Sequence, residues 1–126
     1  MIVVDTSIIV AIIREETEAS VFIDILDDTA AVMSAVSYVE TQMVIAGRKP
    51  DADPRRVELT AADLGIEIID VTRDQADAAV RALLLYGRGH HRARLNSCAL
   101  AKSRGLLLLF TGDDFATTDI VAARPL

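Results

Sequence analysis

The sequence predicts an α/β fold, a three-layer α/β/α sandwich built around a mostly parallel sheet. Short runs of apolar, largely β-branched residues alternate with longer amphipathic stretches, which is the pattern of strands joined by helices. The most apolar run, 106–110, is uninterrupted, as expected for a central parallel strand buried on both faces. With 126 residues, the chain is long enough for a single domain over 1–126.

Helix-capping residues mark the boundaries of the elements expected in the N-terminal half. The first strand is the apolar run that ends on Asp5, and Thr6 or Ser7 is expected to cap the following helix. The remaining elements are a helical stretch over 7–28 that breaks near 14–17 and restarts at the cap Thr17, a strand over 29–35, and a helix from Ser34 or Ser37 to about 48.

The C-terminal half begins with a loop over 49–54, whose prolines and acids join two helices of the same domain. The expected elements after it are a helix over 55–64 ended by Gly65, a strand over 66–71, a helix over 73–86 capped by Thr72, a helix over 96–104 with Gly105 at its C′ position, the strand over 106–110, and a short strand near 120–121.

The composition is that of a folded protein in a reducing compartment. The chain is 52% hydrophobic and 25% charged, which excludes a disordered segment. No apolar run is long enough to span a membrane, and the N-terminus lacks the basic region of a signal peptide. The single cysteine, Cys98, forms no internal disulfide, so we expect a cytoplasmic protein.

Acidic residues follow two of the predicted strands. Asp5 ends the first strand, and Asp113 and Asp114 follow the strand over 106–110. If these strands are parallel neighbours, their carboxylates meet at one edge of the sheet, where ligands of open α/β sheets bind. Such hard oxygen ligands, without His or Cys at zinc spacing, favour Mg²⁺ or Mn²⁺. The alternative is that Asp113 and Asp114 only form a turn.

Glu40 is a fourth candidate ligand, because the helical pattern places it among apolar residues. Val36 lies four positions before it, and Met43 and Val44 lie three and four positions after it. A glutamate on such a face needs an ion pair or a metal. The alternative is an edge position from which the side chain reaches water.

A basic block lies between the last two predicted helices, and no acid interrupts it. Its charged or titratable members are Arg88, His90, His91, Arg92 and Arg94. The net charge of −6 argues against nucleic-acid binding by the whole surface, but a local patch of this kind suits RNA phosphates. A solvated loop and a docking surface for an acidic partner are equally open interpretations.

Five segments, in the right order and spread over nearly the whole chain, resemble the VapC-type toxins of the PIN-domain family. They are Val3-Val4-Asp5-Thr6-Ser7, Met33-Ser34-Ala35 leading to Val39-Glu40, Tyr86-Gly87-Arg88-Gly89, Ala99-Leu100-Ala101-Lys102, and Leu108-Leu109-Phe110-Thr111-Gly112-Asp113-Asp114-Phe115.

The resemblance implies an endoribonuclease toxin that depends on Mg²⁺ or Mn²⁺ and cleaves cellular RNA. It further implies a cognate VapB-like antitoxin, whose C-terminal segment lies across the active site, and a homodimer. By motif match, Asp5 and Glu40 take the first two acidic positions and Asp113 or Asp114 the last.

The chain departs from the family pattern at one place. The family carries Asn, an aromatic residue and Gly-Asp before the Ala-Leu-Ala helix, whereas Asn96 is followed here at once by Ser97 and Cys98. The third acidic residue therefore has no counterpart, and the gap of about five residues exceeds one helical turn. Two explanations are open: the chain has lost these residues, or they are absent only from the sequence as given.

Three other functions compete with the ribonuclease. A PIN-like module that binds antitoxin or RNA without cleaving is the strongest rival if the gap is real. A receiver-like phosphoacceptor domain needs an acid pair after the first strand and a late lysine, and the chain has Thr6-Ser7 and no lysine after Lys102. A haloacid-dehalogenase-type phosphatase needs a second aspartate where Ser7 stands.

Overall fold

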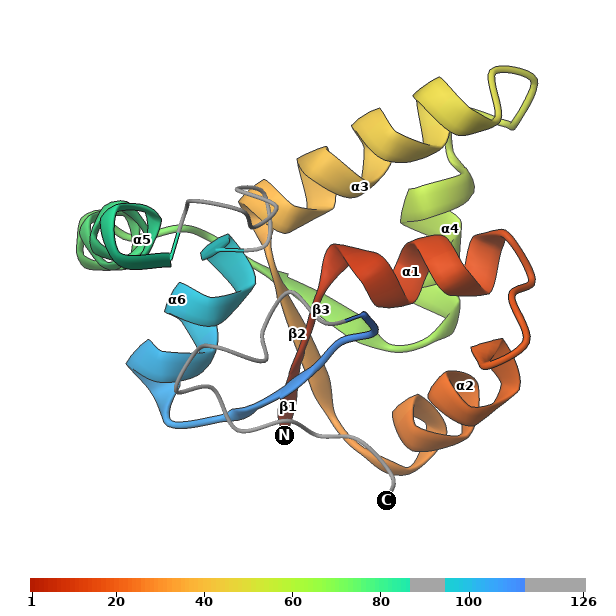
Figure 1. The fold of residues 1–126 in the computed structure, drawn as a ribbon. Coiled ribbons are helices and arrows are strands. Elements are labelled where there is room, and N and C mark those ends of the chain that lie inside the picture. The colour runs from red at the N-terminus through yellow and green to blue at the C-terminus, as the bar shows by residue number, and fades with distance from the viewer. Residues whose placement is uncertain (87–94, 113–126) are drawn as a thin grey trace.

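In the computed structural model, residues 1–86 and 95–112 are described, and strands alternate with helices along them (Figure 1). Within these residues no helix is both long and apolar enough to cross a bilayer. The elements are β1 (Ile2–Val4), α1 (Thr6–Ile13), α2 (Ala19–Asp28), β2 (Ala31–Ser34), α3 (Ala35–Arg48), α4 (Arg56–Asp63), β3 (Ile66–Ile69), α5 (Arg73–Tyr86), α6 (Leu95–Arg104) and β4 (Leu107–Leu109). The strand predicted near 120–121 lies outside the described residues.

The described strands form one sheet in the order β3-β2-β1-β4, and every pair of neighbours is parallel. Val4 pairs with Leu109, so β1 and β4 end at the same edge of the sheet. The backbone N–H of Asp5 continues this pairing by donating to the carbonyl of Leu109 at 3.0 Å. The sheet therefore brings the carboxyl ends of β1 and β4 together, as the sequence predicts.

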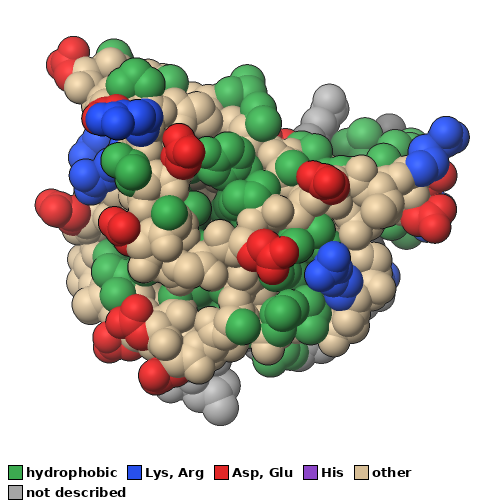
Figure 2. Space-filling model, turned by 180° about the vertical axis from the view of Figure 1, so that it is seen from behind, with side chains coloured by type: hydrophobic (Ala, Val, Ile, Leu, Met, Phe, Trp, Pro, Cys, Tyr) green, Lys and Arg blue, Asp and Glu red, His purple; other side chains and the backbone are tan. Residues whose placement is uncertain are grey.

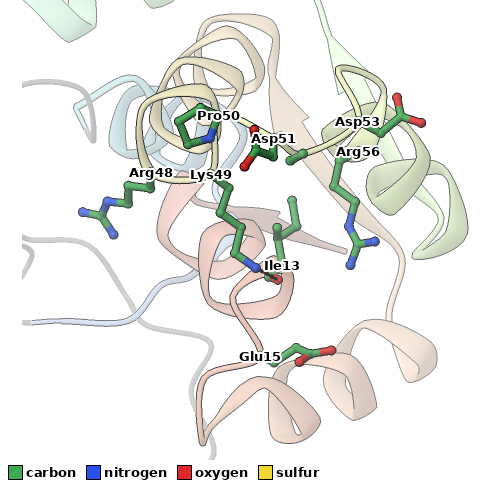
Figure 3. Close-up of a pocket in the computed structure, with 9 residues that line it drawn as sticks. Ile13, Glu15, Arg48, Lys49, Pro50, Asp51, Asp53 and Arg56 are labelled. Atoms are coloured by element: carbon green, nitrogen blue, oxygen red, sulfur yellow. Dashed lines mark hydrogen bonds between the residues drawn. The ribbon is translucent and has the colours of Figure 1, made fainter.

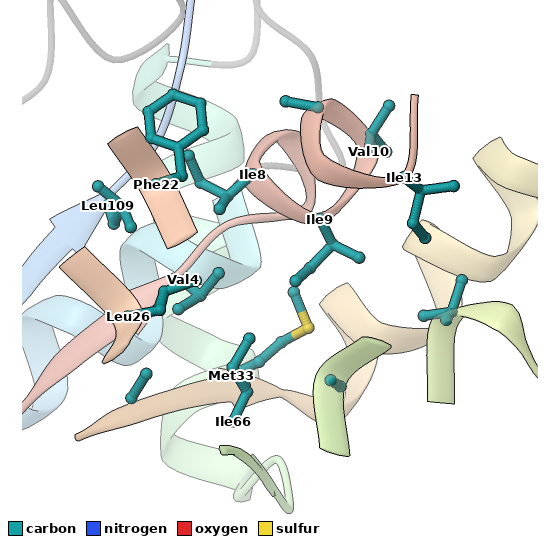
Figure 4. Close-up of a cluster of buried hydrophobic side chains, with 14 of the residues drawn as sticks. Val4, Ile8, Ile9, Val10, Ile13, Phe22, Leu26, Met33, Ile66 and Leu109 are labelled. Carbon is teal, nitrogen blue, oxygen red and sulfur yellow. The ribbon is translucent and has the colours of Figure 1, made fainter. Parts of the chain in front are cut away.

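Successive residues of the strands point to opposite faces of the sheet, and each face has its own core. On one face Val4, Met33 and Leu109 pack against α1 to α4, and Figure 4 shows α1 lying over them. On the other face Val3 and Leu108 pack against α6, which in turn contacts α5. These three layers confirm the predicted α/β/α sandwich.

Several predicted helix boundaries are confirmed by hydrogen bonds. The Ser34 side chain caps α3 by accepting from the backbone N–H of Val36 at 3.2 Å. Thr72 accepts from the N–H of Gln75 at 3.1 Å and begins α5 in the same way. Gly105 has a φ of +62°, and its left-handed conformation ends α6 as predicted.

Two predicted caps are wrong. Asp5, rather than Thr6 or Ser7, is the N-cap of α1, because the helix begins one residue earlier and an aspartate caps as well as a hydroxyl does. Thr17 does not cap α2, whose N-cap is Glu18 and has no side-chain bond. There the first helical N–H, that of Ala19, donates to the Glu16 carbonyl in a tight turn.

β4 lies at the edge of the four described strands, although its apolar sequence predicts a central position. Leu108 and Leu109 are nevertheless fully buried, because helices cover both faces of this strand. Leu107 remains 43% exposed. An uninterrupted apolar run thus indicates that a strand is buried on both faces, not that it is central in the sheet.

Replacing Leu109 with alanine is expected to lower the free energy of unfolding by about 2–5 kcal/mol, because the side chain is fully buried beside β1. The matched control is Leu107→Ala in the same strand, which removes a half-exposed side chain and should cost much less. Denaturant unfolding measures both, and equal losses would contradict the described packing.

Candidate active site

Asp5 lies at the carboxyl end of β1 and is fully buried. Its Oδ2 accepts a hydrogen bond from the backbone N–H of Ser7 at 3.0 Å, which is the N-capping bond of α1. Its Oδ1 accepts from the hydroxyl of Ser97, at the start of α6, at 2.8 Å. The carboxylate is therefore held between the first turn of α1 and the first turn of α6.

Glu40 extends from α3 toward the same place and is half-buried. Its Oε1 accepts a hydrogen bond from the side-chain amide of Asn96 at 3.2 Å. Its Oε2 is buried, and no described residue donates a hydrogen bond to it. A buried carboxylate oxygen without a donor is unfavourable unless a cation or a proton occupies its lone pairs.

The two carboxylates interact electrostatically. The pKa of Glu40 is raised from 4.5 to about 7, chiefly by burial and then by the charge of Asp5, whereas the hydrogen bond from Asn96 opposes the rise. At neutral pH the Glu40 side chain is thus divided between its charged and neutral forms. A carboxyl with this property next to a second acid is typical of functional sites.

Glu40 was predicted as a ligand because it was expected to lie on an apolar face of its helix, and this reason is partly wrong. The predicted apolar face includes Met43, but this side chain is 68% exposed. The buried side chains of this part of α3 are instead Ser37, Thr41 and Ile45. Glu40 borders a polar strip of the helix, and that strip packs beside α1 and α6.

The sequence did not single out Asn96 or Ser97 as site residues, yet both contact the predicted acids. The available signal was their position, because this polar pair opens α6 at the point where the chain lacks residues of the family pattern. Ser37 was also not predicted as a site residue. It is connected to Asp5 through Ser97, because the two serine hydroxyls lie 3.0 Å apart.

The remaining predicted site residues lie outside the described residues. They are Asp113 and Asp114, and Arg88, His90, His91, Arg92 and Arg94 of the basic block. The chain reaches the site just before the two aspartates, however, because the backbone N–H of Thr111 donates to the Ser7 hydroxyl at 3.1 Å. Residue 111 therefore lies at the edge of the sheet that carries Asp5.

The described side chains fit part of a divalent-cation site. Asp5 and Glu40 offer carboxylate oxygens, and the Glu40 oxygen without a donor is suited to Mg²⁺ or Mn²⁺. Among residues 1–86 and 95–112, no group of three or more His, Cys, Asp or Glu side chains gathers closely enough to hold a metal.

A separate hollow of about 500 Å³ lies at the opposite end of α1 (Figure 3). Ile13, the last residue of α1, and Lys49 line it, and the Lys49 ammonium donates to the Ile13 carbonyl at 3.4 Å. Seen from behind, basic side chains gather near the turn between α3 and α4, and further basic side chains lie among acidic and apolar ones on the opposite side of this face (Figure 2). This hollow does not contain the paired carboxylates.

Comparisons with known proteins identify the family. The PIN domain profile matches residues 2–121. The chain belongs to the PIN-domain family. Ribonuclease VapC of Mycolicibacterium smegmatis is 41% identical to this PIN domain over 128 residues, which cover 97% of the chain and 99% of that protein. The predicted resemblance to VapC-type ribonuclease toxins is thereby confirmed.

Solved structures show the same fold. The Mycobacterium tuberculosis toxin VapC20, described as cleaving the sarcin-ricin loop, superposes with a TM-score of 0.78 at 20% identity, covering 99% of this chain and 100% of that one. A chain of a toxin–antitoxin complex from Klebsiella pneumoniae has a TM-score of 0.71 at 19% identity, with coverages of 98% and 97%.

The alignment with the M. smegmatis protein also contains a gap. It runs over 128 residues, whereas 97% of this 126-residue chain is about 122 residues. About six positions of the relative within the aligned stretch thus have no partner in this PIN domain. This number is close to the gap of about five residues inferred after Asn96 from the family pattern.

The raised pKa of Glu40 predicts a pH-dependent stability in the metal-free protein. Between pH 4.5 and about 7 the folded state keeps a proton that the unfolded state has lost, so this residue's contribution to the free energy of unfolding falls as the pH rises through that range. In Glu40→Gln this contribution is absent. Denaturant unfolding at several pH values measures the difference, and a difference that does not vary with pH would refute the assignment.

Proposed function

We propose that this PIN domain is the ribonuclease toxin of a toxin–antitoxin pair and hydrolyses RNA with Mg²⁺ or Mn²⁺. The supporting observation is the pair of carboxylates at one edge of the sheet, in which Glu40 has a buried oxygen that no residue in the described part of the chain donates to. In the proposed site Asp5, Glu40 and Asp113 or Asp114 hold the cation.

In this mechanism the two described acids have different tasks. Asp5, fixed by the Ser7 N–H and the Ser97 hydroxyl, provides a carboxylate of set orientation. Glu40 would be held in its ionised form beside a bound cation, because a positive charge nearby lowers a carboxyl pKa. The bound cation would polarise the scissile phosphate and lower the pKa of the attacking water.

The cation is held weakly in this proposal, because the third acidic position of the family has no counterpart here. The described residue beside Glu40 is Asn96, whose neutral amide donates to the Glu40 carboxylate and adds no negative charge. This observation favours the second candidate function, a PIN module that binds its partner or RNA without cleaving. The metal-binding and cleavage experiments below distinguish the two.

The proposed partners follow from the relatives and from the surface. A VapB-like antitoxin is the expected inhibitor, since a solved relative of the same fold is a toxin–antitoxin complex. RNA phosphates are the proposed ligands of Arg88, His90, His91, Arg92 and Arg94. A homodimer in the cytoplasm is also proposed, and the exposed apolar side chains of Leu84 and Leu85 on α5 are available for such a contact.

We expect the purified chain to bind Mn²⁺ and to cleave RNA only when Mg²⁺ or Mn²⁺ is present. Asp5→Asn should abolish both, because it removes the negative charge and keeps a side chain that caps α1 equally well. Calorimetry measures Mn²⁺ binding, a gel assay measures cleavage, and thermal melting checks that the variant is folded. If Asp5→Asn cleaves as fast as the natural chain, the proposed site is wrong.

Asn96→Asp is expected to strengthen Mn²⁺ binding by roughly tenfold or more, because it places a second charge against Glu40 at the start of α6. The matched control is Asn96→Gln, which keeps the amide and should bind no better than the natural chain. Binding without cleavage in the natural chain, and cleavage in Asn96→Asp, would support the non-cleaving candidate as the natural function.

A further inference from the structure

Two buried serine hydroxyls connect α3 and α6 to the Asp5 carboxylate. Ser37 on α3 and Ser97 on α6 are both fully buried. Their hydroxyl oxygens lie 3.0 Å apart, and the Ser97 hydroxyl donates to Asp5 Oδ1 at 2.8 Å. The serines stand 60 positions apart in the sequence, so the contact depends on the complete packing of α3 against α6.

The direction of these hydrogen bonds follows from proton counting. A serine hydroxyl has one proton to donate, and an ionised carboxylate has none. Since Ser97 gives its proton to Asp5, its oxygen is the acceptor of the Ser37 hydroxyl. The chain therefore runs in one direction, from Ser37 to Ser97 to Asp5.

This chain of donors completes the restraint on Asp5. The Ser7 N–H of α1 donates to Oδ2, and the Ser97 hydroxyl of α6 donates to Oδ1. Rotation of the carboxylate would therefore break both hydrogen bonds. Hydrogen bonds to an ionised group are stronger than neutral ones. The Ser97 bond also benefits from the donation of Ser37, because linked hydrogen bonds polarise one another.

We infer that Ser97 is a positioning residue for the metal-binding carboxylate of Asp5, and that Ser37 orients the Ser97 hydroxyl for this task. The inference rests on the proposed metal-dependent function. Groups that hydrogen-bond a metal ligand typically contribute 10- to 100-fold to metal affinity when they fix the ligand's orientation. Ser97 acts through Asp5 and need not touch RNA or the cation.

Thr41 offers a matched control within the same cluster. It lies one helical turn after Ser37 on α3 and is also fully buried. Its hydroxyl lies 2.7 Å from the Ser37 carbonyl and 3.2 Å from the Thr6 hydroxyl, and neither partner is an acid. Replacing Thr41 with valine removes a buried hydroxyl of this interface and leaves the contact between Ser97 and Asp5 in place.

The first experiment measures Mn²⁺ affinity by calorimetry in the full chain. Ser97→Ala should bind Mn²⁺ 10- to 100-fold more weakly, and Ser97→Cys should behave alike, because a thiol is a weak donor. Ser37→Ala should lose less, since Ser97 still donates to Asp5. Thr41→Val should bind as the natural chain does. Natural affinity in Ser97→Ala and Ser97→Cys, or an equal loss in Thr41→Val, would overturn the inference.

The second experiment needs no metal and separates this inference from the proposed function. The side-chain carboxyl ¹³C resonance of Asp5 is compared by NMR in the metal-free proteins. It should move in Ser97→Ala and Ser97→Cys but not in Thr41→Val. If the natural chain binds no Mn²⁺, the proposed metal chemistry fails, and a resonance that still moves supports the Ser97 contact. A resonance unchanged in all variants overturns it.

Discussion

The structure depends on the burial of one carboxylate. A charged group removed from water requires hydrogen bonds or an ion of opposite charge. Asp5 is fully buried, and its two oxygens accept from α1 and from α6. This requirement explains why the interface among α1, α3 and α6 is lined by hydroxyl side chains rather than by the branched apolar residues that fill the layer above the sheet. The polar interface and the candidate site are the same feature.

The two described acids differ in how completely the protein satisfies them. Each Asp5 oxygen has a donor from a different helix, whereas one buried Glu40 oxygen receives no hydrogen bond from any residue of 1–86 and 95–112. This difference separates a carboxylate of fixed orientation from one whose charge depends on its surroundings. Two chemically similar side chains thus have distinct properties because the three helices around them supply different donors.

Apolar patterning predicted the layers, the parallel sheet and the meeting of β1 with β4, because burial on both faces of a sheet leaves a strong signal. It did not predict the buried face of α3, since Ser37 and Thr41 look exposed when hydrophobicity alone is counted. Asp5 was predicted as a strand-end acid but not as a helix cap, although the residue does both. The roles of Asn96 and Ser97 depend on packing between helices that are far apart in the sequence, and such packing cannot be predicted from the residues around them.

Because β1 is the first strand to be synthesised, its position beside β4 affects when the site can form. The first strand to leave the ribosome pairs with β4, and the contacts that close the site join residues 92 and 104 positions apart. Because chains emerge N-terminus first, Asp5 is made long before Ser97, the residue that donates to its Oδ1. A chain that stops before Ser97 therefore lacks the hydrogen bond that joins Asp5 to α6.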